Sequence, residues 1–241
     1  MKDTLRLHSD KVKMVAHRGL SGLETESTNS AFVAAGNRSY WGIETDVRVT
    51  ADGKFICLHD ADTASVAQDR LTAAESSFEA LRSLRLMEKD GQKNRADLRL
   101  SCPEEYLSIC RKYDKEAVLE IKGLYTEEQL EQLLDAVRFS GWLERTTFIC
   151  GRAEYLIYLR RFLPENRMQF VGWKLEDAGM LDTFAEHRIS LDLCHKGIDA
   201  DLVRHAHACG LEVNAWVVND IETAQQMIAC GVDYLTTNIL E

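Results

Sequence analysis

The second half of the chain alternates short apolar runs with amphipathic segments, and this rhythm restricts the fold more than any other feature. From Ala117 onward, each apolar run has the length of a strand, and the segment after it has helical spacing. Parallel strands need a crossover helix between them, so this alternation is typical of parallel β/α units. The predicted helices of this part are Glu127–Phe139, Glu154–Phe162, Glu176–His187, Asp199–Ala208 and Ile221–Cys230.

The first part of the chain is less regular but contains the same kinds of element. Thr28 is a suitable N-cap for a helix over Ser30–Arg38, and Pro103 suits the first turn of a helix that reaches Tyr113. A further helix is predicted over Ser77–Leu86 and a polar surface loop over Lys89–Arg99. The candidate strands are Val12–His17, Gly42–Val47, Phe55–Leu58, Ala117–Ile121, Thr146–Cys150, Met168–Val171, Ile189–Leu193, Glu212–Val218 and Val232–Thr236.

This pattern predicts a single α/β domain over residues 1–241 with the (β/α)8 barrel (TIM barrel) fold. The chain has 241 residues and only 2 prolines, without a Gly/Ser-rich linker, which fits one barrel. A barrel has eight places, so one candidate strand is extra. The connection Arg48–Lys54 is too short for a crossover helix, which parallel neighbours usually need, so the sequence leaves the arrangement of strands two and three open. A doubly wound sheet is the alternative, but no G-x-G-x-x-G follows the first strand.

Charge and cysteine content exclude several classes of partner. The net charge of −10 argues against nucleic-acid or stable membrane association, because both need a positive surface. The 7 cysteines are scattered without a C-x-x-C pair, which favours reduced thiols in a cytoplasmic protein. Met1–Lys13 is polar and lacks the apolar core of a signal peptide, and no apolar run approaches the length of a membrane span.

Chemically useful side chains gather at the predicted strand ends, where barrels form their sites. Residues i and i+2 of a strand share one face, so Glu44 lies beside Asp46, and Glu120 beside Lys122. Three carboxylates without cysteine favour one Mg²⁺ or Ca²⁺ ion. The remaining candidates are His17, Arg18, His59 and Trp216.

These residue types suit cleavage of a phosphodiester. Arginine and lysine beside a metal bind an anionic oxygen cluster, and two histidines can accept and donate a proton near neutral pH. A bland interpretation exists for each residue alone: a core histidine, a surface ion pair or a packing tryptophan. The combination favours metal-assisted hydrolysis of a small phosphodiester substrate.

The residues also resemble those of the glycerophosphodiester phosphodiesterases, and the likeness covers almost the whole chain. Each short motif is weak alone, whereas the ordered set is specific. The matching segments are His17-Arg18-Gly19, Glu26-Ser27-Thr28, Glu44-Thr45-Asp46-Val47, Thr50-Ala51-Asp52-Gly53, His59-Asp60, Glu120-Ile121-Lys122, Trp216-Val217-Val218-Asn219 and Thr236-Thr237-Asn238.

The resemblance implies a TIM barrel that uses a divalent metal to release glycerol 3-phosphate and an alcohol. By position, it implies that the two histidines are the general acid and base, and that Trp216 packs on the substrate. Glu26 matches a glutamate that supports the glycerol or metal region. The implied metal ligands are Glu44, Asp46 and Glu120, the implied phosphate binders Arg18 and Lys122, and the implied acid/base pair His17 and His59.

Two departures from the family pattern leave alternatives open. Thr25 and Ser27 stand where the family has proline and asparagine, and Asp62–Ser65 lacks an arginine that often follows His-Asp. The alternatives are a lysophospholipid-cleaving or other phosphodiesterase on the same barrel, and a barrel that binds glycerol phosphates without turnover.

Overall fold

The computed structural model describes residues 3–7, 11–92, 95–177 and 179–241. The predicted segments Met1–Lys13, Lys89–Arg99 and Glu176–His187 each include residues outside this set. The strands are β1 Lys13–Ala16, β2 Gly42–Val49, β3 Phe55–Cys57, β4 Glu116–Ile121, β5 Thr146–Cys150, β6 Met168–Gly172, β7 Ser190–Cys194, β8 Val213–Trp216 and β9 Tyr234–Thr237. The helices are α1 Asn29–Gly36, α2 Phe78–Ser83, α3 Pro103–Lys112, α4 Glu127–Phe139, α5 Ala153–Arg160, α6 Met180–Glu186, α7 Ala200–Ala208 and α8 Ile221–Cys230.

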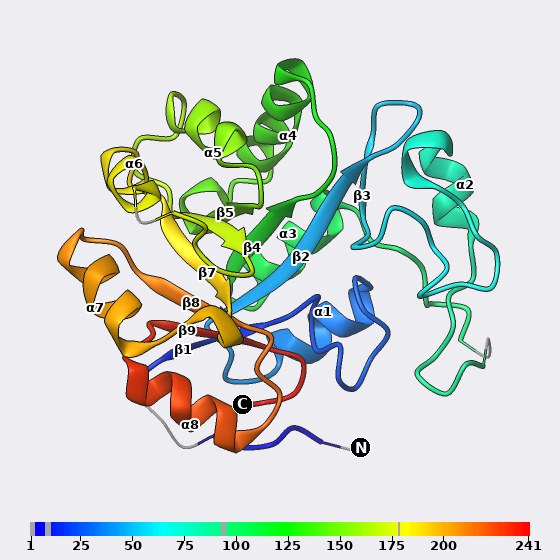
Figure 1. Cartoon of the computed structure of the whole chain (residues 1–241). Coiled ribbons are helices and arrows are strands. Elements are labelled where there is room, and N and C mark those ends of the chain that lie inside the picture. Colours follow the sequence, from blue (N-terminus) through cyan, green and yellow to red (C-terminus); the bar gives the residue numbers. More distant parts are fainter. Residues whose placement is uncertain (1–2, 8–10, 93–94, 178) are drawn as a thin grey trace.

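The described strands form a closed parallel barrel with helices around it (Figure 1). β1 pairs in parallel with β2 on one side and with β9 on the other, which closes the ring. The ring continues from β2 to β4 and then through the strands in chain order. The predicted (β/α)8 barrel is therefore confirmed, and the doubly wound alternative is wrong.

The ninth candidate strand lies outside the ring. β3 pairs antiparallel with the far end of β2, where Val47 faces Cys57 and Val49 faces Phe55. The short connection between them therefore makes a hairpin, and β2 pairs directly with β4 inside the barrel. After the hairpin the chain returns to the barrel rim, where the Leu58 amide donates to the Asp46 carbonyl at 3.0 Å. This return brings the end of β3 to the site.

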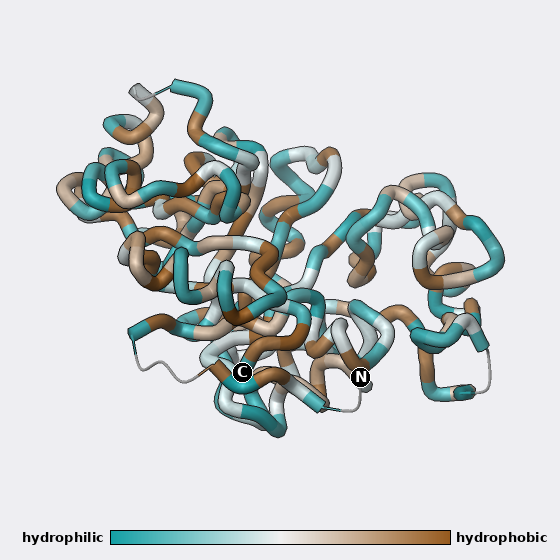
Figure 2. Tube along the Cα trace, turned by 60° about the horizontal axis from the view of Figure 1, so that its bottom comes forward, coloured by the Kyte–Doolittle hydropathy of each residue, from teal (hydrophilic) through white to brown (hydrophobic). Residues whose placement is uncertain are grey.

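The segment between β3 and α3 has a small apolar core of its own. Its buried residues form a cluster separate from the main core between barrel and helices, and it stands to one side of the barrel in Figures 1 and 2. Two backbone bonds tie it to the barrel: Ser101 N–H to the Ser27 carbonyl at 3.1 Å and Cys57 N–H to the Ser101 carbonyl at 2.9 Å. The buried members are Ile56, Leu58, Val66, Ala67, Ala73, Leu81, Leu86, Leu98 and Leu100.

Local sequence signals position several of the helices. The Thr28 hydroxyl accepts from the Ala31 amide, as expected of the N-cap of α1. Thr126 and Gln129 form a reciprocal capping box at the start of α4, and Pro103 occupies the first turn of α3. Within the described part of the chain, no helix has the length and hydropathy that a membrane crossing requires.

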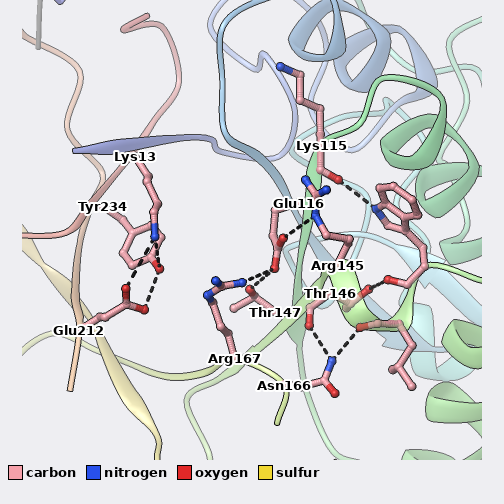
Figure 3. A network of polar contacts seen from close by, with 12 residues as sticks. Lys13, Lys115, Glu116, Arg145, Thr146, Thr147, Asn166, Arg167, Glu212 and Tyr234 are labelled. Atoms are coloured by element: carbon pink, nitrogen blue, oxygen red, sulfur yellow. Dashed lines mark hydrogen bonds and ion pairs between the residues drawn. The ribbon is translucent and has the colours of Figure 1, made fainter. Parts of the chain in front are cut away.

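The barrel interior is layered, because alternate residues of each strand point inward. The middle is apolar, with Val15, Val118, Ile149 and Tyr234 in one buried cluster. Below it, at the strand starts, lies the polar network of Figure 3. Above it, at the strand ends, lie the predicted site residues.

Candidate active site

A cavity of about 430 Å³ opens at the C-terminal ends of the strands. Its lining contains most of the residues predicted from the sequence, brought from β1, β2, β4, β8 and the segment after β3. Asp46 and Glu26 are absent from the lining but contact residues within it. The predicted lining residues are His17, Arg18, Glu44, His59, Glu120, Lys122 and Trp216.

The three predicted metal ligands converge. Glu44, Asp46 and Glu120 can each place one carboxylate oxygen within 4.8 Å of the others. All three are buried, and no described residue donates a hydrogen bond to either carboxylate oxygen of Asp46. Buried like charges at this separation repel, so the cluster fits a divalent cation bound through oxygen.

The pKa values of the three carboxyl groups are shifted because the groups are buried close to one another. Burial, reinforced by Asp46 and Glu120, raises the pKa of Glu44 well above its ordinary value. Burial and Asp46 likewise raise the pKa of Glu120 to about 7. Burial also opposes ionisation of Asp46, but Lys122, His59 and Arg18 outweigh it and lower the pKa of Asp46.

Both predicted phosphate binders border the cluster. Lys122 Nζ lies 2.6 Å from Glu120 Oε1 and 3.2 Å from Asp46 Oδ1, and Arg18 Nε lies 3.5 Å from Asp46 Oδ2. The Arg18 backbone N–H donates to Glu44 Oε2 at 2.7 Å. The tight turn at Arg18 and Gly19 therefore positions the side chains of Arg18 and Glu44. Gly19 makes this turn possible: its φ is 74°, and a Cβ there would lie 2.7 Å from Ala31.

Glu26 lies behind Arg18 rather than among the metal ligands. Its Oε1 accepts from Arg18 Nη1 at 2.8 Å, which fixes the guanidinium beside Asp46. Neighbouring Ser27, where the family has asparagine, has φ 57°, in the left-handed region that asparagine tolerates better than serine. Its hydroxyl is buried and has no hydrogen-bond partner among the described residues. Serine in place of asparagine at position 27 therefore leaves the contact between Glu26 and Arg18 intact, but it lacks the longer amide side chain that asparagine would offer for hydrogen bonds.

His17 is held in one orientation by the end of the chain. Its Nδ1 lies 2.8 Å from Asn238 Oδ1, which also accepts from the Ser21 hydroxyl at 2.9 Å. Because that oxygen is an acceptor, Nδ1 carries the proton, and Nε2 keeps a free lone pair. Burial, with Arg18 nearby, lowers the pKa of His17 to about 4, so the ring is neutral near pH 7.

His59 has a different partner. Its Nδ1 lies 2.8 Å from Asp60 Oδ1, and its backbone carbonyl accepts from Arg48 Nε at 2.9 Å. The two histidines thus share the cavity but differ in their immediate partners.

Trp216 forms a wall of the cavity, and its Nε1–H donates to the Asp192 carbonyl at 2.9 Å. Its ring packs against that of Trp173 with centroids 5.4 Å apart. Trp173 itself is 71% exposed.

Two residues without a predicted role belong to the site: Asn238, which orients His17, and Asp192, which lines the cavity. Asp192 could have been found from its sequence position, since it is an acidic residue at an inward-facing place in the apolar strand β7.

A closed parallel barrel with clustered carboxylates, two cations and two imidazoles at one end has the equipment of a phosphoric diester hydrolase. Comparison with known proteins agrees. The sequence model of the Glycerophosphoryl diester phosphodiesterase family matches residues 17–241, and the chain belongs to this family.

The relatives match over nearly the full chain. The glycerophosphodiester phosphodiesterase of Caldanaerobacter subterraneus is 25% identical over 235 residues, covering 95% of this chain and 94% of that protein. Human glycerophosphodiester phosphodiesterase 1 is 24% identical over 266 residues, covering 96% and 80%. Among solved structures, an Oleispira antarctica phosphodiesterase in complex with the product sn-glycerol-3-phosphate matches with a TM-score of 0.86 at 18% identity, covering 97% and 95%. The structural likeness supports the barrel fold.

Proposed function

We propose that the protein hydrolyses glycerophosphodiesters to sn-glycerol 3-phosphate and an alcohol, in a metal-dependent reaction. The observation that carries the proposal is the convergence of three buried carboxylates within 4.8 Å, with Lys122 in contact and two histidines in the lining of the same cavity. Relatives of nearly full coverage are named for this activity, and a structural neighbour holds its product.

The ligands of one Mg²⁺ or Ca²⁺ ion are Glu44, Asp46 and Glu120. When bound, the ion supplies Lewis-acid stabilisation of the phosphate oxygens. Arg18 and Lys122 bind the phosphate and stabilise the charge that develops on it. Glu26 keeps Arg18 in place through their ion pair of 2.8 Å, and Trp216 packs against the substrate.

The two histidines divide the proton transfers. Neutral His17, with its lone pair on Nε2, accepts the proton of the nucleophile as a new P–O bond forms. The nucleophile is water, or a substrate hydroxyl that first gives a cyclic phosphate which water then opens to sn-glycerol 3-phosphate. His59, supported by Asp60, donates a proton to the departing alkoxide as the bond from phosphorus to the leaving alcohol breaks. Nδ1–H of His17 stays on Asn238 throughout. This assignment rests on the different partners of the two rings.

The test is hydrolysis of glycerophosphocholine with Mg²⁺ or with Ca²⁺, and with EDTA as control. We expect turnover with metal and none with EDTA. His17→Ala and His59→Ala should each lower kcat by about 10²–10⁴-fold. His207→Ala is a matched control, because His207 also pairs with an aspartate, Asp233 at 2.9 Å, outside the cavity lining. Activity that survives in both site variants would contradict the proposal.

The same assay separates the other predictions. A lysophospholipid substrate remains the alternative, decided by comparing rates on glycerophosphocholine and lysophosphatidylcholine. Tight binding without turnover would instead support a non-catalytic barrel. We further propose that residues 1–241 act as a single catalytic domain in the cytoplasm, without nucleic-acid or stable membrane partners. Fractionation of cells that produce the protein would test its location.

A further inference from the structure

Asp192 is a buried carboxyl group that the reaction outlined above does not use. It stands third in β7, its side chain lines the cavity, and its residue is 3% exposed. None of the described residues donates a hydrogen bond to its Oδ1, which is buried. A polar group buried without a partner costs about 1–3 kcal/mol, so this carboxyl does not serve stability.

The other inward-facing carboxylates of the barrel each have a hydrogen-bond donor or a cationic side chain beside them; for Asp46 it is Lys122 Nζ at 3.2 Å. Glu44 accepts from the Arg18 amide, Glu120 contacts Lys122, and Glu116 contacts two arginines. Asp192 is also outside the group of carboxylates close enough to share one ion, which comprises Glu44, Asp46 and Glu120. It therefore needs a partner other than the metal.

The place of Asp192 in the barrel indicates what that partner is. Around the ring, β7 lies opposite β2, so the carboxyl faces the metal cluster across the cavity. The wall between them on the β5–β6 side is apolar, with Ile149 and Val171 in the lining. The backbone carbonyl of Asp192 accepts from the indole N–H of Trp216, and both residues line the cavity. This half of the cavity suits a short carbon chain that bears a polar group.

The polar group is better matched by a hydroxyl than by an ammonium. Burial raises the pKa of Asp192 well above its ordinary value, which favours the neutral form of the carboxyl. A neutral carboxyl offers one donor and one acceptor, the complement of an alcohol. The cavity already contains Arg18 and Lys122, which disfavour a further cation.

We propose that Asp192 binds a hydroxyl of the substrate's glycerol group and thereby selects glycerophosphodiesters over phosphodiesters without a polyol. This inference rests on the proposed function. Asp192 contacts the retained half of the substrate, whereas the leaving alcohol lies outside this subsite. The geometry that carries the inference is a buried, unpartnered carboxyl in a cavity that an indole also lines, opposite the site of phosphate chemistry.

The experiment compares glycerophosphocholine with propylphosphocholine, which has the same length but no glycerol hydroxyls. Asp192→Leu should lower kcat/KM for glycerophosphocholine about 10–100-fold, mostly through KM, because a hydroxyl is left unpaired. It should change kcat/KM for propylphosphocholine by less than about twofold. Asp192→Asn should retain most of the preference, since an amide also donates and accepts. Glycerophosphoethanolamine should show the same loss as glycerophosphocholine.

Ile149→Val is the matched control: it alters the same wall without a polar group and should affect both substrates equally. Equal losses on both substrates in Asp192→Leu would overturn the proposal, as would no loss on either. Asp192→Ala makes the same comparison if the leucine variant fails to fold. A loss that depends on the leaving alcohol would assign the carboxyl to that alcohol and overturn the proposal.

Calorimetry separates this inference from the proposed function. If the wild-type protein hydrolyses no glycerophosphodiester, the proposed function fails, but the subsite is still decided by binding. Asp192→Leu should weaken binding of sn-glycerol 3-phosphate about 10–100-fold and leave binding of propyl phosphate unchanged. Equal weakening of both ligands, or of neither, would overturn the assignment of Asp192.

Discussion

The two ends of β4 carry the same residue in opposite circumstances. Glu116, at its start, lies in the network of Figure 3, where its oxygens contact Arg145 at 3.2 Å, Arg167 at 3.4 Å and the Thr147 hydroxyl at 3.0 Å. Glu120, near its end, contacts one lysine and two further carboxylates. Both side chains are buried inside the barrel.

The comparison distinguishes buried polar groups that stabilise the fold from buried polar groups that serve function. At the lower end, more cationic and hydroxyl groups than carboxylates converge, so a buried charge is compensated within the fold. At the upper end, three carboxylates compete for two cations, and burial raises the pKa values of Glu44 and Glu120. The surplus of negative charge at the upper end is what the proposed cation would neutralise, so this end is optimised for function rather than for stability.

Matched glutamate-to-glutamine substitutions at the two ends test this comparison, and the largest effect belongs to the upper end. Glu44→Gln keeps an oxygen for the Arg18 amide but removes a proposed metal ligand. We expect kcat/KM to fall at least about a hundredfold. In EDTA the free energy of unfolding should stay level or rise by about 1 kcal/mol, because repulsion is relieved. Clear destabilisation in EDTA would show that Glu44 has a structural role instead.

At the lower end the same substitution should have the reverse effect. Glu116→Gln leaves Arg145 and Arg167 without their anion, while both are partly exposed and can reach water. We expect a loss of about 2 kcal/mol in the free energy of unfolding, measured by urea denaturation. kcat/KM should stay within about threefold of wild type. A large loss of activity in a stable variant would break the comparison, since it would couple the lower network to the chemistry.

Much of this arrangement was predictable from the sequence because strand periodicity is strict. Residues two apart share a face, which correctly paired Glu44 with Asp46 and Glu120 with Lys122. The hairpin of β3 was not predictable, because a three-residue strand gives no sign of its direction. His59 therefore reaches the rim on an antiparallel return, rather than on a barrel strand.

Contacts between distant segments also could not be predicted. Asn238 orients His17 from 221 positions away, and sequence periodicity does not indicate which loops meet above a barrel. Asp192 is a different case: the sequence shows an acidic residue at an inward-facing place of β7, but only the structure shows that its Oδ1 has no hydrogen-bond partner among the described residues. The described structure identifies such groups because it shows which polar atoms are satisfied and which are not.

His17, at the upper end of the barrel, should make the free energy of unfolding depend on pH. Its pKa is lowered to about 4 in the folded protein, so below about pH 6.5 the unfolded chain binds more protons and stability falls. The His17 ring faces the cavity along one edge, so the loss of stability at low pH is smaller than for a fully enclosed imidazole. We therefore expect wild type to lose about 1–2 kcal/mol more than His17→Gln between about pH 7 and pH 5. Urea denaturation at the two pH values measures this difference. An equal loss of the free energy of unfolding in wild type and His17→Gln would contradict the contribution of His17.

The smallest effect is expected where the lower network reaches solvent. Lys13 Nζ lies 3.7 Å from Glu212 Oε1, and both side chains are about 40% exposed (Figure 3). Exposed ion pairs contribute about 0–1 kcal/mol, so Lys13→Met should change the free energy of unfolding by less than about 0.5 kcal/mol. Tyr234 still donates to Glu212 at 2.7 Å, which keeps the carboxylate satisfied. A loss comparable to that of Glu116→Gln would mean that the lower end acts as one cooperative network, and that Glu116 depends on partners it does not touch.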